Sequence, residues 1–365
     1  ARGLLDPVPG AVLTRHGLID RTAALWGIHL PDSILAKEEA RRRLAFDELL
    51  RVQLVLVGRK RAFERDSRGI KHVVDGQLVP RFLQALPFPL TGAQQRVIGE
   101  ISVDLAGPHP MHRLLQGDVG SGKTVVAVNA MLMAVQGKHQ GALMAPTEVL
   151  AEQHFVGVSR LLAGLQVPDP DNLFGDRPLR VELLTGRVTG EKRRAVLAEL
   201  AAGTIDIVIG THALIQEGVQ FNSLGVVVID EQHRFGVEQR AALSQKGSDA
   251  STPDVLVMTA TPIPRTAAMT VYGDLDVSVL DELPPGRTPI VTKWAAGPLL
   301  EQMMWGEMRD AVAAGQQGFV VCPLIEESDK LEVASAEQVF ERLGQEELHG
   351  VRLGLLHGRM SSNEK

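Results

Sequence analysis

The spacing of hydrophobic residues changes along the chain and divides it into four parts. Residues 1–36 mix single apolar residues with Pro and Gly, which predicts an irregular segment. From Ala36 to Phe63 apolar residues recur every three or four positions, the spacing of a helix. Pro87 and Pro89 then interrupt the chain, so residues 1–85 are expected to form an irregular and helical connector.

Helical stretches alternate with short β-branched runs between Leu90 and Leu280. These runs predict strands at 112–116, 141–144, 181–184, 205–209, 226–229 and 255–258. Strands that alternate with helices of this length form βαβ units, in which a parallel sheet is covered by helices on both faces. The sequence therefore predicts an α/β domain over residues 86–282.

A second, shorter α/β unit is expected after a proline-rich linker. Residues 283–290 include Leu-Pro-Pro-Gly-Arg, which cannot continue a helix or a central strand. Beyond them, residues 291–365 predict helices near 299–314 and 333–343 and strands at 319–322 and 351–356. Because the chain stops where Ser361 and Glu364 indicate a new helix, we expect an internal piece of a longer protein.

Composition narrows the class of protein. The 365 residues are 44% hydrophobic and 22% charged, which excludes a disordered or coiled-coil chain. Cys322 is the single cysteine, so no internal disulfide is expected, and no uncharged apolar run is long enough to predict a membrane span. The net charge is −6, so contact with nucleic acid has to be local. Residues 37–71, with eleven Lys or Arg against six Asp or Glu, are either a solvated helix face or a phosphate-binding surface.

The clearest chemical motif is the phosphate loop, residues 117–124, which reads Gly-Asp-Val-Gly-Ser-Gly-Lys-Thr and matches G-x-x-x-x-G-K-[ST] in full. Glycines allow successive N–H groups to converge on phosphate oxygens, while Lys123 adds a charge at the β- and γ-phosphates and Thr124 offers a hydroxyl to Mg²⁺. A chance match on a flexible turn is the alternative, and the strand before the loop and the apolar helix after it argue against that. The predicted ATP ligands here are Gly117, Asp118, Val119, Gly120, Ser121, Gly122, Lys123 and Thr124.

A second motif supplies carboxylates. The apolar run at 226–229 ends in Asp230 and Glu231. Asp230 can hold Mg²⁺ and Glu231 can polarise the water that attacks the γ-phosphate, so Glu231 and Lys123 are the predicted catalytic residues. Alone, this pair would read as a solvent-facing turn. Beside the phosphate loop it predicts hydrolysis of ATP, with Mg²⁺ held by Thr124 and Asp230.

The order of short motifs resembles that of superfamily 2 helicases. It comprises Leu-Thr-Gly-Ala-Gln at 90–94, the phosphate loop, Ala-Pro-Thr-Glu at 145–148, Gly-Thr-His-Ala-Leu at 210–214, Asp-Glu-Gln-His at 230–233 and Thr-Ala-Thr-Pro at 259–262. Longer strings resemble the RecG family of bacterial DNA helicases, at 230–237, 259–266, 281–288, 324–328 and 356–360. The resemblance implies two RecA-like domains and ATP-driven remodelling of stalled forks and Holliday junctions in recombination and repair.

The resemblance also implies roles for residues that would otherwise read as helix caps or structural side chains. Gln94 matches the family's adenine-reading glutamine. Residues that would couple the nucleotide to DNA and to the second domain are Gln232, His233, Thr259 and Thr261. Residues that would contact DNA are Thr147, Thr211, His212 and Arg265.

The implied partners are branched double-stranded and single-stranded DNA, with contact to single-strand-binding protein left open. The protein would be a monomer without a membrane partner, in the bacterial cytoplasm at the nucleoid. The family's distal arginine-finger string and its wedge OB fold do not occur in this sequence. We therefore expect these residues to bind ATP, to hydrolyse it weakly and to unwind nothing. The alternatives are a transcription-repair coupling factor-like translocase on double-stranded DNA, a P-loop ATPase without a nucleic-acid role, and a degenerate ATPase that serves as a binding module.

Overall fold

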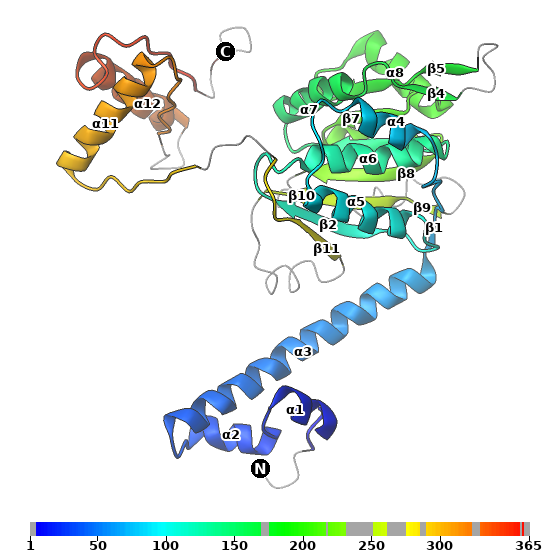
Figure 1. Cartoon of the computed structure of the whole chain (residues 1–365), viewed down its shortest axis with the longest axis vertical. Helices are drawn as coiled ribbons and strands as arrows, with labels where there is room; N and C mark the ends of the chain where they lie inside the picture. The colour runs from blue at the N-terminus through cyan, green and yellow to red at the C-terminus, as the bar shows by residue number, and fades with distance from the viewer. Residues whose placement is uncertain are drawn as a thin grey trace. The chain divides into compact units, whose positions relative to one another are not determined.

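The computed structural model describes residues 5–168, 175–216, 218–230, 251–260, 275–284, 290–322, 329–357 and 360, with only the backbone over 329–335. It divides into two compact units, Ala1–Arg287 and Thr288–Lys365 (Figure 1). The division falls inside the segment 283–290 that the sequence assigns to a linker. Each unit is described by itself.

Two short helices open the first unit, and the prediction of an irregular segment over 1–36 is wrong. They are α1 (Gly10–His16) and α2 (Arg21–His29). The Asp20 carboxylate starts α2 by accepting from the N–H groups of Thr22 and Ala23. A Cβ on Gly27 would lie 3.1 Å from that of Ala40, so α2 approaches the next helix closely through small residues. Small contact residues leave little hydrophobic periodicity in the sequence, which explains the error.

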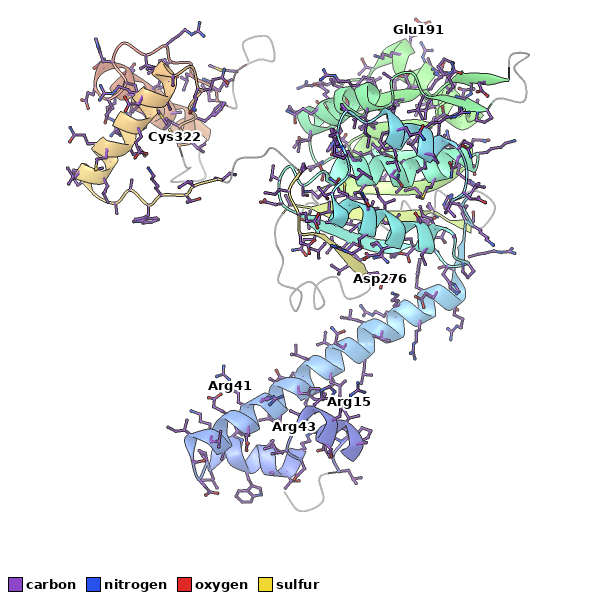
Figure 2. The ribbon with its side chains drawn as sticks, viewed as in Figure 1. Arg15, Arg41, Arg43, Glu191, Asp276 and Cys322 are labelled. Atoms are coloured by element: carbon purple, nitrogen blue, oxygen red, sulfur yellow. The ribbon has the colours of Figure 1, made fainter. Side chains whose placement is uncertain are left out.

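The helix predicted from Ala36 to Phe63 is confirmed as α3 (Ile34–Asp66), which Ser33 caps by accepting from the N–H of Ala36. Arg43 on α3 is fully buried where α1 and α2 pack (Figure 2). Its guanidinium donates to Asp47 and, across 2.6 Å, to Asp6. One of the basic residues of 37–71 is therefore an internal structural cation.

A seven-stranded sheet forms the centre of the first unit and confirms the α/β prediction. All of its recorded pairings are parallel, in the order β11-β2-β10-β8-β3-β7-β6. The strands are β2 (His112–Gly117), β3 (Gln140–Met144), β6 (Val181–Leu184), β7 (Ile207–Gly210), β8 (Leu224–Asp230), β10 (Asp254–Thr259) and β11 (Asp276–Leu280). The six predicted strands are confirmed, with β7 beginning two residues later than expected, while the edge strand β11 was not predicted.

Helices cover both faces of this sheet (Figure 1). One core cluster joins the sheet to α4 (Leu78–Ala85), α5 (Gly92–Leu105), α6 (Lys123–Gln136) and α7 (Glu148–Leu161), and the other joins it to α8 (Gly190–Ala202) and the 3₁₀ helix η1 (His212–Ile215). Along β8, Val226 and Val228 belong to the first cluster while Val227 and Ile229 belong to the second. A strand with both faces buried has a continuous apolar sequence. Two small pairs complete the unit, β1 (Arg68–Gly69) with β9 (Ser251–Thr252) and β4 (Gln166–Pro168) with β5 (Asp176–Pro178).

The second unit contains the two predicted helices, α11 (Pro298–Ala313) and α12 (Asp329–Gln345), around a small core of Trp305, Leu343 and Leu348. The predicted strands at 319–322 and 351–356 do not form: both segments are described, and neither is in a strand. They line a common cavity of about 840 Å³ without pairing. A two-stranded pair without further neighbours is marginally stable, which accounts for the difference.

Among the helices described, none is long and apolar enough to cross a bilayer.

Candidate nucleotide site

The phosphate loop and the acidic strand tip lie at the same edge of the sheet. β2 ends at Gly117 and β8 ends at Asp230, with β10 between them. The ladders align Gln116 with Thr259 and Met258 with Asp230. Because all three strands are parallel, their carboxyl ends share one edge, and two strand spacings separate the outer ends by about 10 Å.

The structure explains why glycine is required at particular positions of the phosphate loop. Gly120 and Gly122 have φ values of 78° and 86°, in the left-handed region that favours glycine. A Cβ on Gly122 would overlap the side-chain nitrogen of Gln94. A Cβ on Gly117 would lie 2.6 Å from Oγ of Ser121. The loop leads into α6 at Lys123, so a helix N-terminus, which favours anions, follows the loop directly.

Two side chains of the loop can donate hydrogen bonds to a phosphate. Nζ of Lys123 donates to the carbonyl oxygens of Gly117 at 2.8 Å and Asp118 at 3.1 Å, so the lysine lies inside the curve of the loop. Oγ of Ser121 is buried without a hydrogen-bond partner in the part of the chain that is described. Val119 is 64% exposed at the loop. A buried hydroxyl and a lysine bonded to loop carbonyls provide donors for phosphate oxygens.

Gln94 connects the start of α5 to the phosphate loop. Its Nε2 donates to the carbonyl oxygen of Ser121 at 2.9 Å, and its Oε1 accepts from the N–H of Thr91 in a capping box. Glu282 adds a further contact by accepting from the N–H of Ala93 at 3.1 Å. The helix that carries Gln94 is therefore held both to the loop and to the chain that follows β11.

A neighbouring pair secures that following chain. Arg96 on α5 donates to Asp281 at 2.8 Å and to the carbonyl oxygen of Val279 at 2.9 Å. The Arg96 hydrogen bond lowers the pKa of the Asp281 carboxyl below its usual range. Both side chains are exposed, so the pair orients the chain more than it stabilises the fold.

Asp230 is largely buried, and His154 of α7 donates from Nε2 to its Oδ2 across 2.7 Å. A carboxylate only accepts hydrogen bonds, so this nitrogen carries the proton. The carboxylate of Asp230 and the hydroxyl of Thr124 are hard oxygen ligands of the kind that Mg²⁺ prefers, so the residues fit this ion. Sequence reasoning missed His154, because nothing in the local sequence shows a contact with a residue 76 positions away.

The other predicted residues that the structure describes extend along the same edge. Thr259 ends β10 and is buried. Thr147 follows β3 and caps α7 by accepting from the N–H of Leu150 at 3.3 Å. Thr211 follows β7 with a buried hydroxyl that has no hydrogen-bond partner among the described residues, and His212 beside it is exposed. The remaining predicted residues lie outside the described ranges and keep their roles as predictions: Glu231, Gln232, His233, Thr261 and Arg265.

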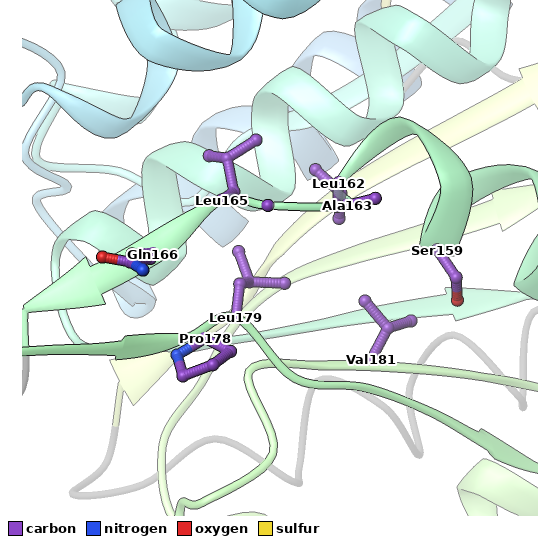
Figure 3. A pocket seen from close by; sticks show the side chains of 9 residues that line it. Ser159, Leu162, Ala163, Leu165, Gln166, Pro178, Leu179 and Val181 are labelled. Carbon is purple, nitrogen blue, oxygen red and sulfur yellow. The ribbon is translucent and has the colours of Figure 1, made fainter.

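A cavity of about 260 Å³ lies away from these residues, between the end of α7 and the β4–β5 pair (Figure 3). Its walls are mostly apolar, with Leu162, Leu179 and Val181 among the side chains. None of the predicted nucleotide or DNA residues lines it.

The sheet and its edge define the class of protein. A phosphate loop, a buried carboxylate two strands further along and hydroxyls at the ends of the next two strands are typical of the RecA-like motor domains of superfamily 2 helicases. A family model described as DEAD/DEAH box helicase matches residues 91–270.

Relatives place the chain within this class. The chain is 45% identical over 365 residues to the ATP-dependent DNA helicase RecG of Bacillus subtilis (strain 168), covering 100% of this chain and 51% of the relative. It is 48% identical over 362 residues to that of Synechocystis sp., covering 99% of this chain and 42% of the relative. The chain is similar to RecG helicases along its whole length, and it spans about half the length of the curated relatives it matches.

Solved structures agree with this assignment. The structure of RecG bound to a three-way DNA junction matches with a TM-score of 0.73 and 38% identity, over 95% of this chain and 43% of that one. The DEAD-box helicase Mss116 bound to single-stranded RNA matches with a TM-score of 0.53 at 17% identity, over 80% of this chain and 60% of that one. The second likeness supports the fold alone.

Proposed function

We propose that this chain carries the ATP-hydrolysing motor of a helicase that remodels branched DNA, such as stalled forks and Holliday junctions. The observation that carries the proposal is the position of Gly117 and Asp230 at one sheet edge, separated by a single strand. The names of the relatives support it, because they are ATP-dependent DNA helicases, and one of them is solved with a three-way junction.

In this proposal the triphosphate lies along the phosphate loop. Lys123 exchanges its bonds to the carbonyl oxygens of Gly117 and Asp118 for bonds to the β- and γ-phosphates. The buried Oγ of Ser121 gains the partner that it lacks in the described structure. Gln94 reads adenine from the first turn of α5, and Glu231, next in sequence to Asp230, polarises the attacking water.

Thr124 and Asp230 would hold Mg²⁺, which neutralises charge on the β- and γ-phosphate oxygens when bound. DNA would follow the same edge of the sheet, where Thr147 and Thr211 present hydroxyls and helix N-termini to phosphates. Such contacts grip a strand without reading its bases. Coupling to DNA and to the second unit would involve Gln232, His233, Thr259 and Thr261, with Arg265 as a further contact.

The proposal extends to the oligomeric state, the location in the cell and a protein partner. The protein acts as a monomer in the bacterial cytoplasm at the nucleoid, where its DNA substrate lies. Contact with single-strand-binding protein is an extension that size-exclusion chromatography of the two proteins together tests directly. A single eluting species at the mass of one chain supports the monomer.

Binding of a fluorescent ATP analogue tests the nucleotide site. Lys123→Ala removes a charged hydrogen-bond donor and is expected to weaken binding about 10–100-fold. Lys192→Ala, an exposed lysine on α8, is the matched control and leaves binding unchanged. Equal affinities of the wild-type chain and the Lys123 variant contradict the site.

A comparison of branched with linear DNA distinguishes the proposed function from the alternative, a translocase on double-stranded DNA. The chain is expected to bind a three-way junction more tightly than a linear duplex of the same length, with weak ATP turnover on both. Thr147→Ala with Thr211→Ala is expected to weaken both DNA ligands without changing ATP binding in their absence. A preference for the linear duplex favours the translocase instead.

A further inference from the structure

His154 lies at the nucleotide site without belonging to any motif that defines it. Its Nε2 is 2.7 Å from Oδ2 of Asp230, and the side chains are only 15% and 12% exposed. In a partly desolvated setting, a hydrogen bond to a charged carboxylate is stronger than a neutral one. The pair therefore restrains the orientation of the Asp230 carboxylate.

The helix that carries His154 is itself firmly placed. Ala151 and Val158 of α7 are fully buried, and Thr147 caps the helix. Arg187, from the loop after β6, bonds Glu148 at 2.7 Å and Glu152 at 3.3 Å in the first turns of α7. The imidazole thus comes from a fixed element, as a group that orients a metal ligand must.

We propose that His154 is a positioning residue for the metal site: it holds one oxygen of Asp230 and leaves the other as the oxygen that Mg²⁺ takes. This inference rests on the proposed function. Residues that bond to a metal ligand fix its orientation, and their loss commonly lowers metal affinity. His154 acts only through Asp230 and does not touch the nucleotide in this assignment.

The test uses two variants of similar size and reach. His154→Gln keeps an N–H donor at about the same distance from the backbone, while His154→Met keeps the volume and removes the donor. Binding of the fluorescent ATP analogue to the full chain is titrated with Mg²⁺, and repeated with excess EDTA. His139→Gln, which replaces a partly buried histidine that bonds Ser223, is the matched control.

His154→Met is expected to raise the Mg²⁺ concentration for half-maximal binding about 10–100-fold and to leave binding in EDTA unchanged. His154→Gln is expected to restore the wild-type Mg²⁺ dependence. A purely structural histidine would lower thermal stability and leave the Mg²⁺ dependence unchanged in both variants, which overturns the inference. A loss of binding in EDTA as large as the loss in Mg²⁺ also overturns it.

The two proposals fail in different ways. If the wild-type chain binds no nucleotide, the proposed function is overturned, and this inference with it. If the wild-type chain binds nucleotide with a clear Mg²⁺ dependence and His154→Met shares that dependence, only this inference is overturned.

Discussion

Gln94 donates from Nε2 to the carbonyl oxygen of Ser121 across 2.9 Å, so the glutamine predicted to read adenine is bonded to the phosphate loop. Its other amide atom accepts from the N–H of Thr91 at 2.9 Å, and the residue is 2% exposed. Both ends of the amide have protein partners in this structure. The predicted base recognition would therefore depend on the same side chain that holds the loop.

Gln94→Ala is expected to lower the free energy of unfolding by about 1–3 kcal/mol, because it removes the partner of the partly buried N–H of Thr91 and of the buried carbonyl oxygen of Ser121. It is also expected to weaken ATP binding, since the loop loses a contact. Chemical denaturation and nucleotide titration measure the two effects. Gln95→Ala, at the exposed neighbouring position, serves as the control.

A comparison of ATP with GTP separates the two roles of Gln94. If the residue reads adenine, the Gln94→Ala variant loses more affinity for ATP than for GTP. Equal losses would restrict Gln94 to supporting the loop. Behaviour identical to that of Gln95→Ala contradicts both roles.

The central sheet is predictable from sequence because its strands are buried on both faces and read as apolar runs, as β8 does from Val226 to Ile229. The edge strand β11 was not predicted, since its sequence Asp-Val-Ser-Val-Leu alternates apolar with polar residues and is not a continuous apolar run. The segments 319–322 and 351–356 fail in the opposite way. Their apolar sequences suit strands, but a ladder also needs a neighbour, and local sequence does not show one.

In the site, too, some features can be recognised from local sequence and others depend on the three-dimensional arrangement. The phosphate loop and Asp230 are recognisable because their chemistry depends on consecutive residues. Their separation by one strand depends on the strand order, which places β10 between two strands that precede it in the chain. The His154 contact depends further on how α7 packs, so it appears only in three dimensions.

Arg43→Ala is expected to destabilise the helical part formed by α1, α2 and α3. Arg43 is fully buried, and its removal leaves the buried carboxylate of Asp47 and the partly buried one of Asp6 without their cation. Breaking a buried pair from one side costs about 3–5 kcal/mol. Arg41→Ala on the exposed face of α3 is the control, and equal denaturation midpoints for the two variants would contradict the buried role.

The stability of the first unit is expected to fall as the pH drops below about 6.5 because of His139. Burial lowers the pKa of this histidine, and His72, whose ring centroid is 5.3 Å away, lowers it further. The folded state thus favours the neutral ring. Its contribution is complete above the unfolded pKa of about 6.5 and is lost as the pH falls through the lower folded pKa.

Melting temperatures of the wild-type chain and of His139→Gln measure this contribution as a difference across the pH range. Glutamine does not titrate, so the variant is expected to show the shallower slope below pH 6.5. His29→Gln, at an exposed position on α2, should keep the wild-type slope. Parallel curves for the wild-type chain and His139→Gln would exclude His139 as the source.

Gly122→Ala is expected to abolish nucleotide binding, because two independent constraints meet at this residue. Its φ of 86° is costly for any residue with a Cβ, and that Cβ would overlap the Gln94 amide. The loop would have to release Gln94 or change its path, and either change moves the N–H groups that are proposed to bind the phosphates. Gly99→Ala is the matched control, since that glycine lies within α5 with open space around its Cβ position. Alanine there should raise stability by about 0.5–1 kcal/mol and leave binding intact, so a Gly122→Ala variant that binds ATP normally would show that the loop does not hold the phosphates.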